Sequence, residues 1–196
     1  YGLYIRGSNV VVKRTRITDS LKNGVYMISL SGEYYANITL MDIVITDSLS
    51  YAMYISPSVT IENIGIINAI ISNNSGSGIY VPISIAGTLH NFSVINSRIY
   101  NNSGNGFYIK GNHILIMNSQ IYNNSGTGLY FTRLTKYVRI INGTITNNGG
   151  HGIYFYMDMG SSYNVTIINS SIIDNANYAM SGKFDTIRDC LLYTSD

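Results

Sequence analysis

A short motif recurs along the whole chain and sets the positions of its other regularities. A small residue, an apolar residue and usually a tyrosine follow one another, and the small residues that we use as anchors are Gly2, Gly24, Ala52, Gly78, Gly106, Gly128 and Gly152. Ala179 opens a degenerate eighth copy. Successive anchors lie 22–28 residues apart, a spacing that is typical of repeat architectures.

The residues before each anchor also repeat. At four fixed distances upstream of the anchor, nearly every copy carries the same kind of residue. Seven residues before the anchor lies an isoleucine, at Ile17, Ile45, Ile71, Ile99, Ile121, Ile145 and Ile172. Twelve residues before it lies an aliphatic residue, at Val12, Leu40, Ile66, Val94, Ile116, Ile140 and Ile167. Five residues before it lies Asp or Asn, at Asp19, Asp47, Asn73, Asn101, Asn123, Asn147 and Asp174. Ten residues before it lies mostly Asn, at Asn68, Asn96, Asn118, Asn142 and Asn169, with Asp42 and Arg14 as exceptions.

This pattern predicts an all-β fold, a right-handed single-stranded parallel β-helix with about seven coils of 22–28 residues and three short strands per coil. The first strand is centred twelve residues before the anchor, the second holds the isoleucine, and the third follows the anchor. Asn and Asp tolerate a left-handed backbone, which places them at the bends. Stacked coils would put each residue above its own copy and form aliphatic and amide ladders. A leucine-rich repeat is excluded because its Leu spacing and helical return are both missing.

The segments 96–108 and 118–130 both read N-x-x-I-x-N-N-x-G-x-G-apolar-Y. This motif resembles the parallel β-helix repeat of the pectin-lyase-like superfamily, and the resemblance extends over residues 1 to about 182. It implies an elongated polymer, usually a carbohydrate, lying along one sheet. A shared fold alone does not determine an activity.

Two segments follow from the repeat, a β-helix over residues 1–182 and a tail over residues 183–196. The chain begins without Met in the middle of a repeat, which indicates a fragment. Residues 187–196 resemble translated sequencing-adapter strings, but Ile187, Asp189 and Leu192 also fit the start of a further coil. Both interpretations stay open, and Cys190 carries no function in either.

Composition narrows the functional classes. Charged residues make up only 11% of the chain and the net charge is +2, which argues against a nucleic-acid partner. No apolar run approaches the roughly 20 residues that span a bilayer, and we expect no membrane span. The single cysteine excludes a disulfide framework, and no His/Cys set suits a metal. We therefore expect no cofactor and no metal site.

A row of tyrosines is the main candidate for function. Strand alternation sends the tyrosine after each anchor outward, and the predicted carbohydrate-binding residues are Tyr26, Tyr54, Tyr80, Tyr108, Tyr130 and Tyr154, with Tyr4 beginning the row. One interpretation is a flat aromatic track for sugar rings. The other is that tyrosines simply stack well on one another in a sheet. A second apolar stripe, which either packs against missing parts of the protein or another chain or tucks into a bend, comprises Met41, Ile67, Ile95, Met117, Ile141 and Ile168.

Catalytic candidates are weaker. Asp19 and Asp47 would stack in adjacent coils, but their position is a turn position. His151 reads as a solvent-exposed turn residue. A group of basic residues, without the carboxylates that a calcium-dependent lyase needs, comprises Lys110, His113, Arg133, Lys136 and Arg139. Loop residues expected to flank the row are Glu33, Tyr34, Tyr35, Asp158 and Tyr163.

The leading hypothesis is a non-catalytic carbohydrate-binding or adhesive segment of an exported surface protein, located outside the cell or in its envelope, with a polysaccharide or glycan as partner. The alternatives are a polysaccharide lyase or glycoside hydrolase of the same superfamily, and a purely structural spacer. No catalytic residues are assigned.

Overall fold

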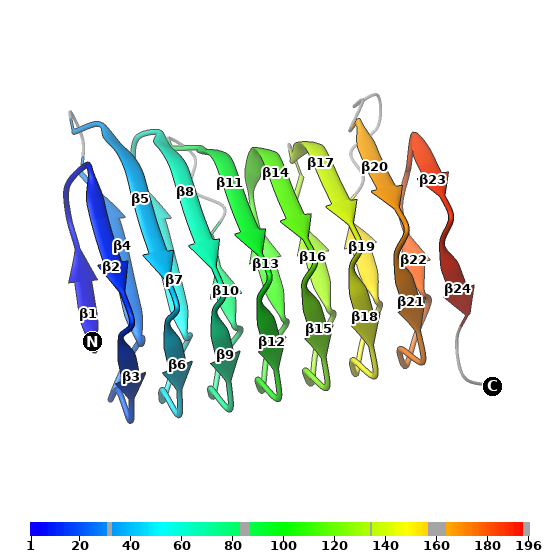
Figure 1. Ribbon diagram of the computed structural model, residues 1–196, viewed down its shortest axis with the longest axis horizontal. Helices are drawn as coiled ribbons and strands as arrows, with labels where there is room; N and C mark the ends of the chain where they lie inside the picture. The colour runs from blue at the N-terminus through cyan, green and yellow to red at the C-terminus, as the bar shows by residue number, and fades with distance from the viewer. Residues whose placement is uncertain (31–32, 83–86, 134, 157–163, 194–196) are drawn as a thin grey trace.

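The protein is a rod of stacked coils, seen in a computed structural model that describes residues 1–30, 33–82, 87–133, 135–156 and 164–193 (Figure 1). The coils succeed one another from the N-terminal end to the C-terminal end of the long axis. All regular elements in these residues are β-strands, and every pairing between them is parallel. The predicted parallel β-helix with three short strands per coil is therefore confirmed.

In the described residues, three parallel sheets run the length of the rod, and each has eight strands. Sheet A contains β1 (Leu3–Ile5), β4 (Val25–Ser29), β7 (Met53–Pro57), β10 (Ile79–Tyr80), β13 (Phe107–Ile109), β16 (Leu129–Phe131), β19 (Ile153–Phe155) and β22 (Met180–Ser181). Sheet B contains β2 (Val10–Lys13), β5 (Tyr35–Met41), β8 (Ile61–Ile67), β11 (Leu89–Ile95), β14 (Gly111–Met117), β17 (Lys136–Ile141), β20 (Val165–Ile168) and β23 (Thr186–Arg188). Sheet C contains β3 (Arg16–Thr18), β6 (Val44–Thr46), β9 (Ile70–Ser72), β12 (Arg98–Tyr100), β15 (Gln120–Tyr122), β18 (Thr144–Thr146), β21 (Ser171–Ile173) and β24 (Leu191–Tyr193).

The strand register places each aliphatic position directly above its own copy. Ile99 pairs with Ile71 on one side and Ile121 on the other, and all three side chains are fully buried. The position twelve before the anchor forms a second interior column, which includes Ile116 and Ile140. Burial of these columns drives the coils together, because a single coil cannot enclose a core alone.

The backbone has the left-handed conformation at the positions where Asn and Asp led us to predict bends. Every residue five or ten positions before an anchor has a φ of 50–58°, including Arg14, which takes the place of the usual Asn. Asn and Asp enter this region at lower cost than other residues with side chains. The position ten before the anchor also forms the predicted amide ladder, on the surface, in which Asn118 Nδ2 donates to Asn96 Oδ1 at 3.2 Å. In the next coil, Asn142 Nδ2 donates to Asn118 Oδ1 at 2.9 Å.

A second amide ladder lies inside the rod, one residue further along than the bend, and the sequence pattern alone did not reveal it. Its members are Asn74, Asn102, Asn124, Asn148 and Asn175, each at most 1% exposed. Each Nδ2 donates to the next Oδ1 at 2.8–3.0 Å. The feature of the sequence that could have revealed this interior ladder is the repeated pair of Asn residues, such as 73–74 and 101–102. The first residue of each pair makes the bend and the second points inward. These bonds satisfy buried amides whose isolation would be costly.

The tail continues two of the sheets. Ile187 of β23 pairs with Ile167, and Leu192 of β24 pairs with Ile172. Asp189 has the left-handed φ of its counterparts, 52°. The side chains of both strands are exposed.

Candidate functional site

The predicted tyrosines form one continuous row on the outer face of sheet A. Each tyrosine pairs in register with the tyrosine of the next coil, from Tyr4 through Tyr154. Neighbouring ring centroids lie 4.9–5.6 Å apart, and the angles between ring planes are 18–45°. The rings are therefore in contact along the rod, stacked from Tyr54 to Tyr130 and tilted toward both ends of the row.

In some coils the residue directly before the anchor is also aromatic, and its ring packs beside the tyrosine row. Tyr51 stacks on Tyr80 with centroids 4.2 Å apart, and His151 stacks on Tyr154 at 5.0 Å. The prediction that His151 is a solvent-exposed turn residue is wrong, because its ring is half-buried between Tyr154 and Tyr178. This burial lowers the pKa of His151 below its ordinary value.

Ring contacts limit the exposure of the row. The coil rise is close to the contact distance of aromatic rings, so the rings from Tyr54 to Tyr130 partly cover the faces of their neighbours. The tyrosines of the row from Tyr26 to Tyr154 are half-buried, whereas Tyr4 at its N-terminal end is exposed. Burial raises the pKa of Tyr80 to about 12, and it also raises the pKa of Tyr108 and Tyr130. These hydroxyls keep their protons and their capacity to donate hydrogen bonds at neutral pH.

Cationic side chains stand beside the row in two places. Arg133 lines a groove of about 160 Å³ together with Tyr108, Tyr130, Thr132 and Tyr156. The charge of Arg133 acts against the burial that raises the Tyr108 pKa. Burial, and then the nearby Arg133, lower the pKa of Lys110. Among the described residues that line this groove, none carries a carboxylate.

The second cationic groove lies at the N-terminal end of the row. It has a volume of about 300 Å³, and its lining includes Lys22, Tyr26, Tyr51 and Tyr54. The Lys22 ammonium lies 5.8 Å from the centroid of the Tyr1 ring, a distance at which a cation is attracted to an aromatic face. The row thus has positive charge near both of its ends.

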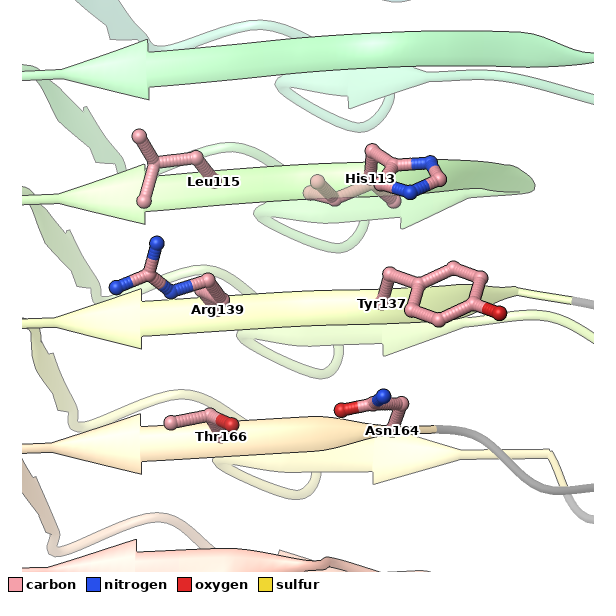
Figure 2. Close-up of a pocket in the computed structure, with 7 residues that line it drawn as sticks. His113, Leu115, Tyr137, Arg139, Asn164 and Thr166 are labelled. Carbon is pink, nitrogen blue, oxygen red and sulfur yellow. The ribbon is translucent and has the colours of Figure 1, made fainter.

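The basic residues that are close in sequence separate onto two faces of the rod. Arg133 lines the sheet A groove, and its charge helps to lower the pKa of Lys110, whereas His113, Lys136 and Arg139 belong to strands of sheet B. On sheet B, His113, Tyr137 and Arg139 line another groove (Figure 2). Sequence distance did not reveal this division, because the chain turns from sheet A to sheet B between Phe131 and Lys136.

The remaining catalytic candidates lie at turns or in ion pairs. Asp19 and Asp47 are exposed at left-handed bends, with φ values of 54° and 58°. Glu33 pairs with Arg6 at 2.6 Å, and this hydrogen bond, together with that from Tyr35, lowers the pKa of Glu33 to about 2. Asp158 and Tyr163 lie outside the described residues.

The described residues contain no group of three or more His, Cys, Asp or Glu that could hold a metal ion. Within the same residues, no helix is long and apolar enough to cross a membrane. The second apolar stripe, from Met41 to Ile168, is half-buried beside the surface amide ladder.

Two solved structures superpose on nearly the whole of this chain. The periplasmic alginate epimerase AlgG superposes with a TM-score of 0.78 and 15% identity, over 99% of this chain and 47% of that protein. The A-module of the mannuronan C-5 epimerase AlgE6 from Azotobacter vinelandii superposes with a TM-score of 0.68 and 16% identity, over 95% of this chain and 49% of that module. The chain thus spans about half the length of each of these structures.

No curated protein matches the sequence. A model of the family described as "Right handed beta helix region" matches residues 58–192, which is more than half of the chain and includes β23 and β24 of the tail. The architecture, the stacked isoleucine columns and this match agree, and the chain belongs to the right-handed β-helix family.

Proposed function

We propose that the chain binds an acidic polysaccharide lengthwise along the tyrosine row of sheet A. The observation that carries this proposal is the combination of an unbroken row of tyrosines with the cationic grooves at Arg133 and Lys22. An extended pyranose polymer repeats once per sugar ring, a step similar to the rise of one coil. Equivalent groups of successive sugars can therefore meet equivalent tyrosines.

The chemistry of the row suits such a polymer. Phenolic hydroxyls that stay protonated donate hydrogen bonds to sugar hydroxyl and carboxylate oxygens without adding negative charge. The Arg133 guanidinium offers a planar fork that matches a carboxylate. Two of the similar structures are named for alginate and mannuronan, so alginate is the acidic polymer that we would test first.

We place this binding role in a non-catalytic segment of an exported protein, outside the cell or in its envelope. A periplasmic protein among the similar structures supports that location. Glycoside hydrolysis requires two carboxyl groups flanking the bond, whereas the described residues that line the groove at Arg133 offer hydroxyl groups and a guanidinium, which suit binding.

Affinity gel electrophoresis against a panel of neutral and acidic polysaccharides tests the proposal. We expect retardation by alginate or another polyuronate, loss of that retardation in Tyr108→Ala/Tyr130→Ala, and a dissociation constant raised about tenfold or more in Arg133→Gln. The matched control is Tyr100→Ala/Tyr122→Ala, which removes a stacked tyrosine pair from the same two coils but from sheet C.

Equal losses in both tyrosine double variants would refute the assignment to sheet A. No retardation by any polysaccharide would refute binding and leave a structural spacer. The release of new chain ends, or a changed uronate composition of the polymer, would instead identify a polysaccharide-modifying enzyme.

A further inference from the structure

A groove on the outer face of sheet B is separate from the tyrosine row. Figure 2 shows its two walls, with His113, Tyr137 and Asn164 in one column and Leu115, Arg139 and Thr166 in the other. The groove has a volume of about 350 Å³ and extends over β14, β17 and the start of β20. This volume is in the range of small-ligand sites.

The first column interrupts a regular amide ladder. The left-handed corner at this position is asparagine in five coils, at Asn9, Asn37, Asn63, Asn91 and Asn164. The first four are joined by side-chain amide hydrogen bonds of 3.0–3.1 Å. His113 and Tyr137 replace Asn in two successive coils and stack on each other, with centroids 4.5 Å apart and ring planes 15° apart.

This replacement carries a backbone cost. Tyr137 keeps a φ of 56°, a left-handed conformation that is unusual for a bulky aromatic residue, whereas His113, with a φ of 55°, is a residue type that enters this region more readily. Both rings give up the amide bonds that Asn would make. Strained residues such as Tyr137 are concentrated at functional sites, and Tyr137 stands on the wall of this groove.

The second column carries positive charge without a partner. Arg139 is exposed and forms no ion pair with any described residue. Lys136 lies on the same strand, and β11, β14, β17 and β20 contain no Asp or Glu. Most backbone N–H groups here are used in the parallel ladder, so an anion must be recognised by side chains. The guanidinium of Arg139 matches a carboxylate in two parallel hydrogen bonds.

The rest of the lining combines apolar and hydrogen-bonding groups. Leu115 and the ring edges of the first column are apolar, whereas Tyr137, Thr166 and Asn164 carry hydroxyl and amide groups. A ring with C–H edges, several hydroxyls and one negative charge complements this lining. We propose that the groove binds one carboxylated sugar residue, with Arg139 on its carboxylate and Tyr137 against its ring. This site is on a different sheet and does not rest on the proposed function.

Isothermal titration calorimetry of the full chain tests this site with three probes: tetramannuronate, free mannuronic acid and uncharged mannotetraose. The titrations are made in an Arg133→Gln background, which weakens the sheet A site. We expect Arg139→Gln to raise the dissociation constant for tetramannuronate about tenfold or more. Arg98→Gln, which removes an exposed arginine from sheet C, should leave it unchanged. Mannotetraose should bind at least tenfold more weakly than tetramannuronate.

A second variant separates binding from folding. His113→Asn/Tyr137→Asn restores the asparagine of the ladder at both positions, so it should fold at least as stably as the parent while losing tetramannuronate affinity. Binding of free mannuronic acid as tight as that of the tetramer would assign the groove to a single sugar acid, and tighter binding of the tetramer would assign it to a unit of a polymer.

Three outcomes overturn the inference: unchanged affinity in Arg139→Gln, unchanged affinity in the asparagine double variant, or mannotetraose binding as tight as that of tetramannuronate. The two sites are distinguished by their arginines. If Arg133→Gln has no effect on the wild type while Arg139→Gln does, the proposed function fails and the sheet B site stands. If Arg139→Gln has no effect while Arg133→Gln does, the sheet B site fails and the proposed function stands.

Discussion

The buried amide ladder should contribute far more to stability than the surface ladder of the same coil. Asn124 Oδ1 accepts hydrogen bonds from the backbone N–H of Asn102 at 3.1 Å and from Asn102 Nδ2 at 3.0 Å. Asn124 Nδ2 donates to Asn148 Oδ1 at 3.0 Å and to the Ile99 carbonyl at 3.2 Å. Asn124→Ala removes all four bonds and leaves the buried backbone N–H of Asn102 without its acceptor, whereas Asn102 Nδ2 keeps its bond to the Ile71 carbonyl at 3.3 Å.

The size of the effect follows from these bonds. Each hydrogen bond contributes about 1 kcal/mol, and each buried group left unsatisfied costs about 1–3 kcal/mol. With four bonds lost and one buried N–H left unsatisfied, we expect Asn124→Ala to lower the free energy of unfolding by about 5–7 kcal/mol. The matched control is Asn118→Gly in the surface ladder, where glycine accepts the φ of 51° and water replaces the lost partners. Its cost should be about 1 kcal/mol.

Urea denaturation followed by circular dichroism measures both variants. The reasoning predicts a much larger fall in the midpoint for Asn124→Ala than for Asn118→Gly, with similar slopes. Equal midpoints for the two variants would show that the interior ladder is not a source of stability. A changed slope would show that the rod no longer unfolds as a single unit.

Three further predictions concern histidine and tyrosine side chains on sheets A and B. His151 has a lowered pKa because its ring is buried. Its contribution to stability is therefore complete above its unfolded pKa of about 6.5 and is lost as the pH falls through the folded pKa. His151→Asn should reduce this loss of stability on acidification, which melting curves recorded at several pH values would measure. Tyr80 should be among the last tyrosines to ionise in an ultraviolet titration, near pH 12, and Tyr80→Phe should remove that step; an unchanged titration would contradict its burial. His113→Asn/Tyr137→Asn should raise the free energy of unfolding by about 1 kcal/mol, because Asn tolerates the left-handed backbone; a fall in the urea midpoint would refute the strain at Tyr137.

The fold could be predicted from the sequence because its determinants are local and repeated. An isoleucine seven residues before every anchor and an Asn or Asp five residues before it report burial and backbone handedness directly. In a solenoid each coil contacts its neighbours, so the same local pattern also determines the long-range pairing. The tyrosine row followed from strand alternation, and the structure has it in full register.

The properties of the candidate site depend on the tertiary structure. Asn73 and Asn74 are adjacent and chemically identical, yet the bend exposes the first and buries the second in the ladder. Arg133 and Arg139 are six residues apart, yet the turn between sheets sends them to different grooves. The coil rise brings the tyrosine rings into contact and leaves most of them half-buried.

The sequence by itself therefore determined the three sheets, the interior columns, the left-handed corners and the row of tyrosines, because each arises from a residue type repeated at a constant offset. Only the tertiary structure decided which amides are buried, how the rings face solvent and which charges share a groove. Those properties depend on the direction in which each bend turns the chain and on the distance between coils, and neither is encoded at any single position.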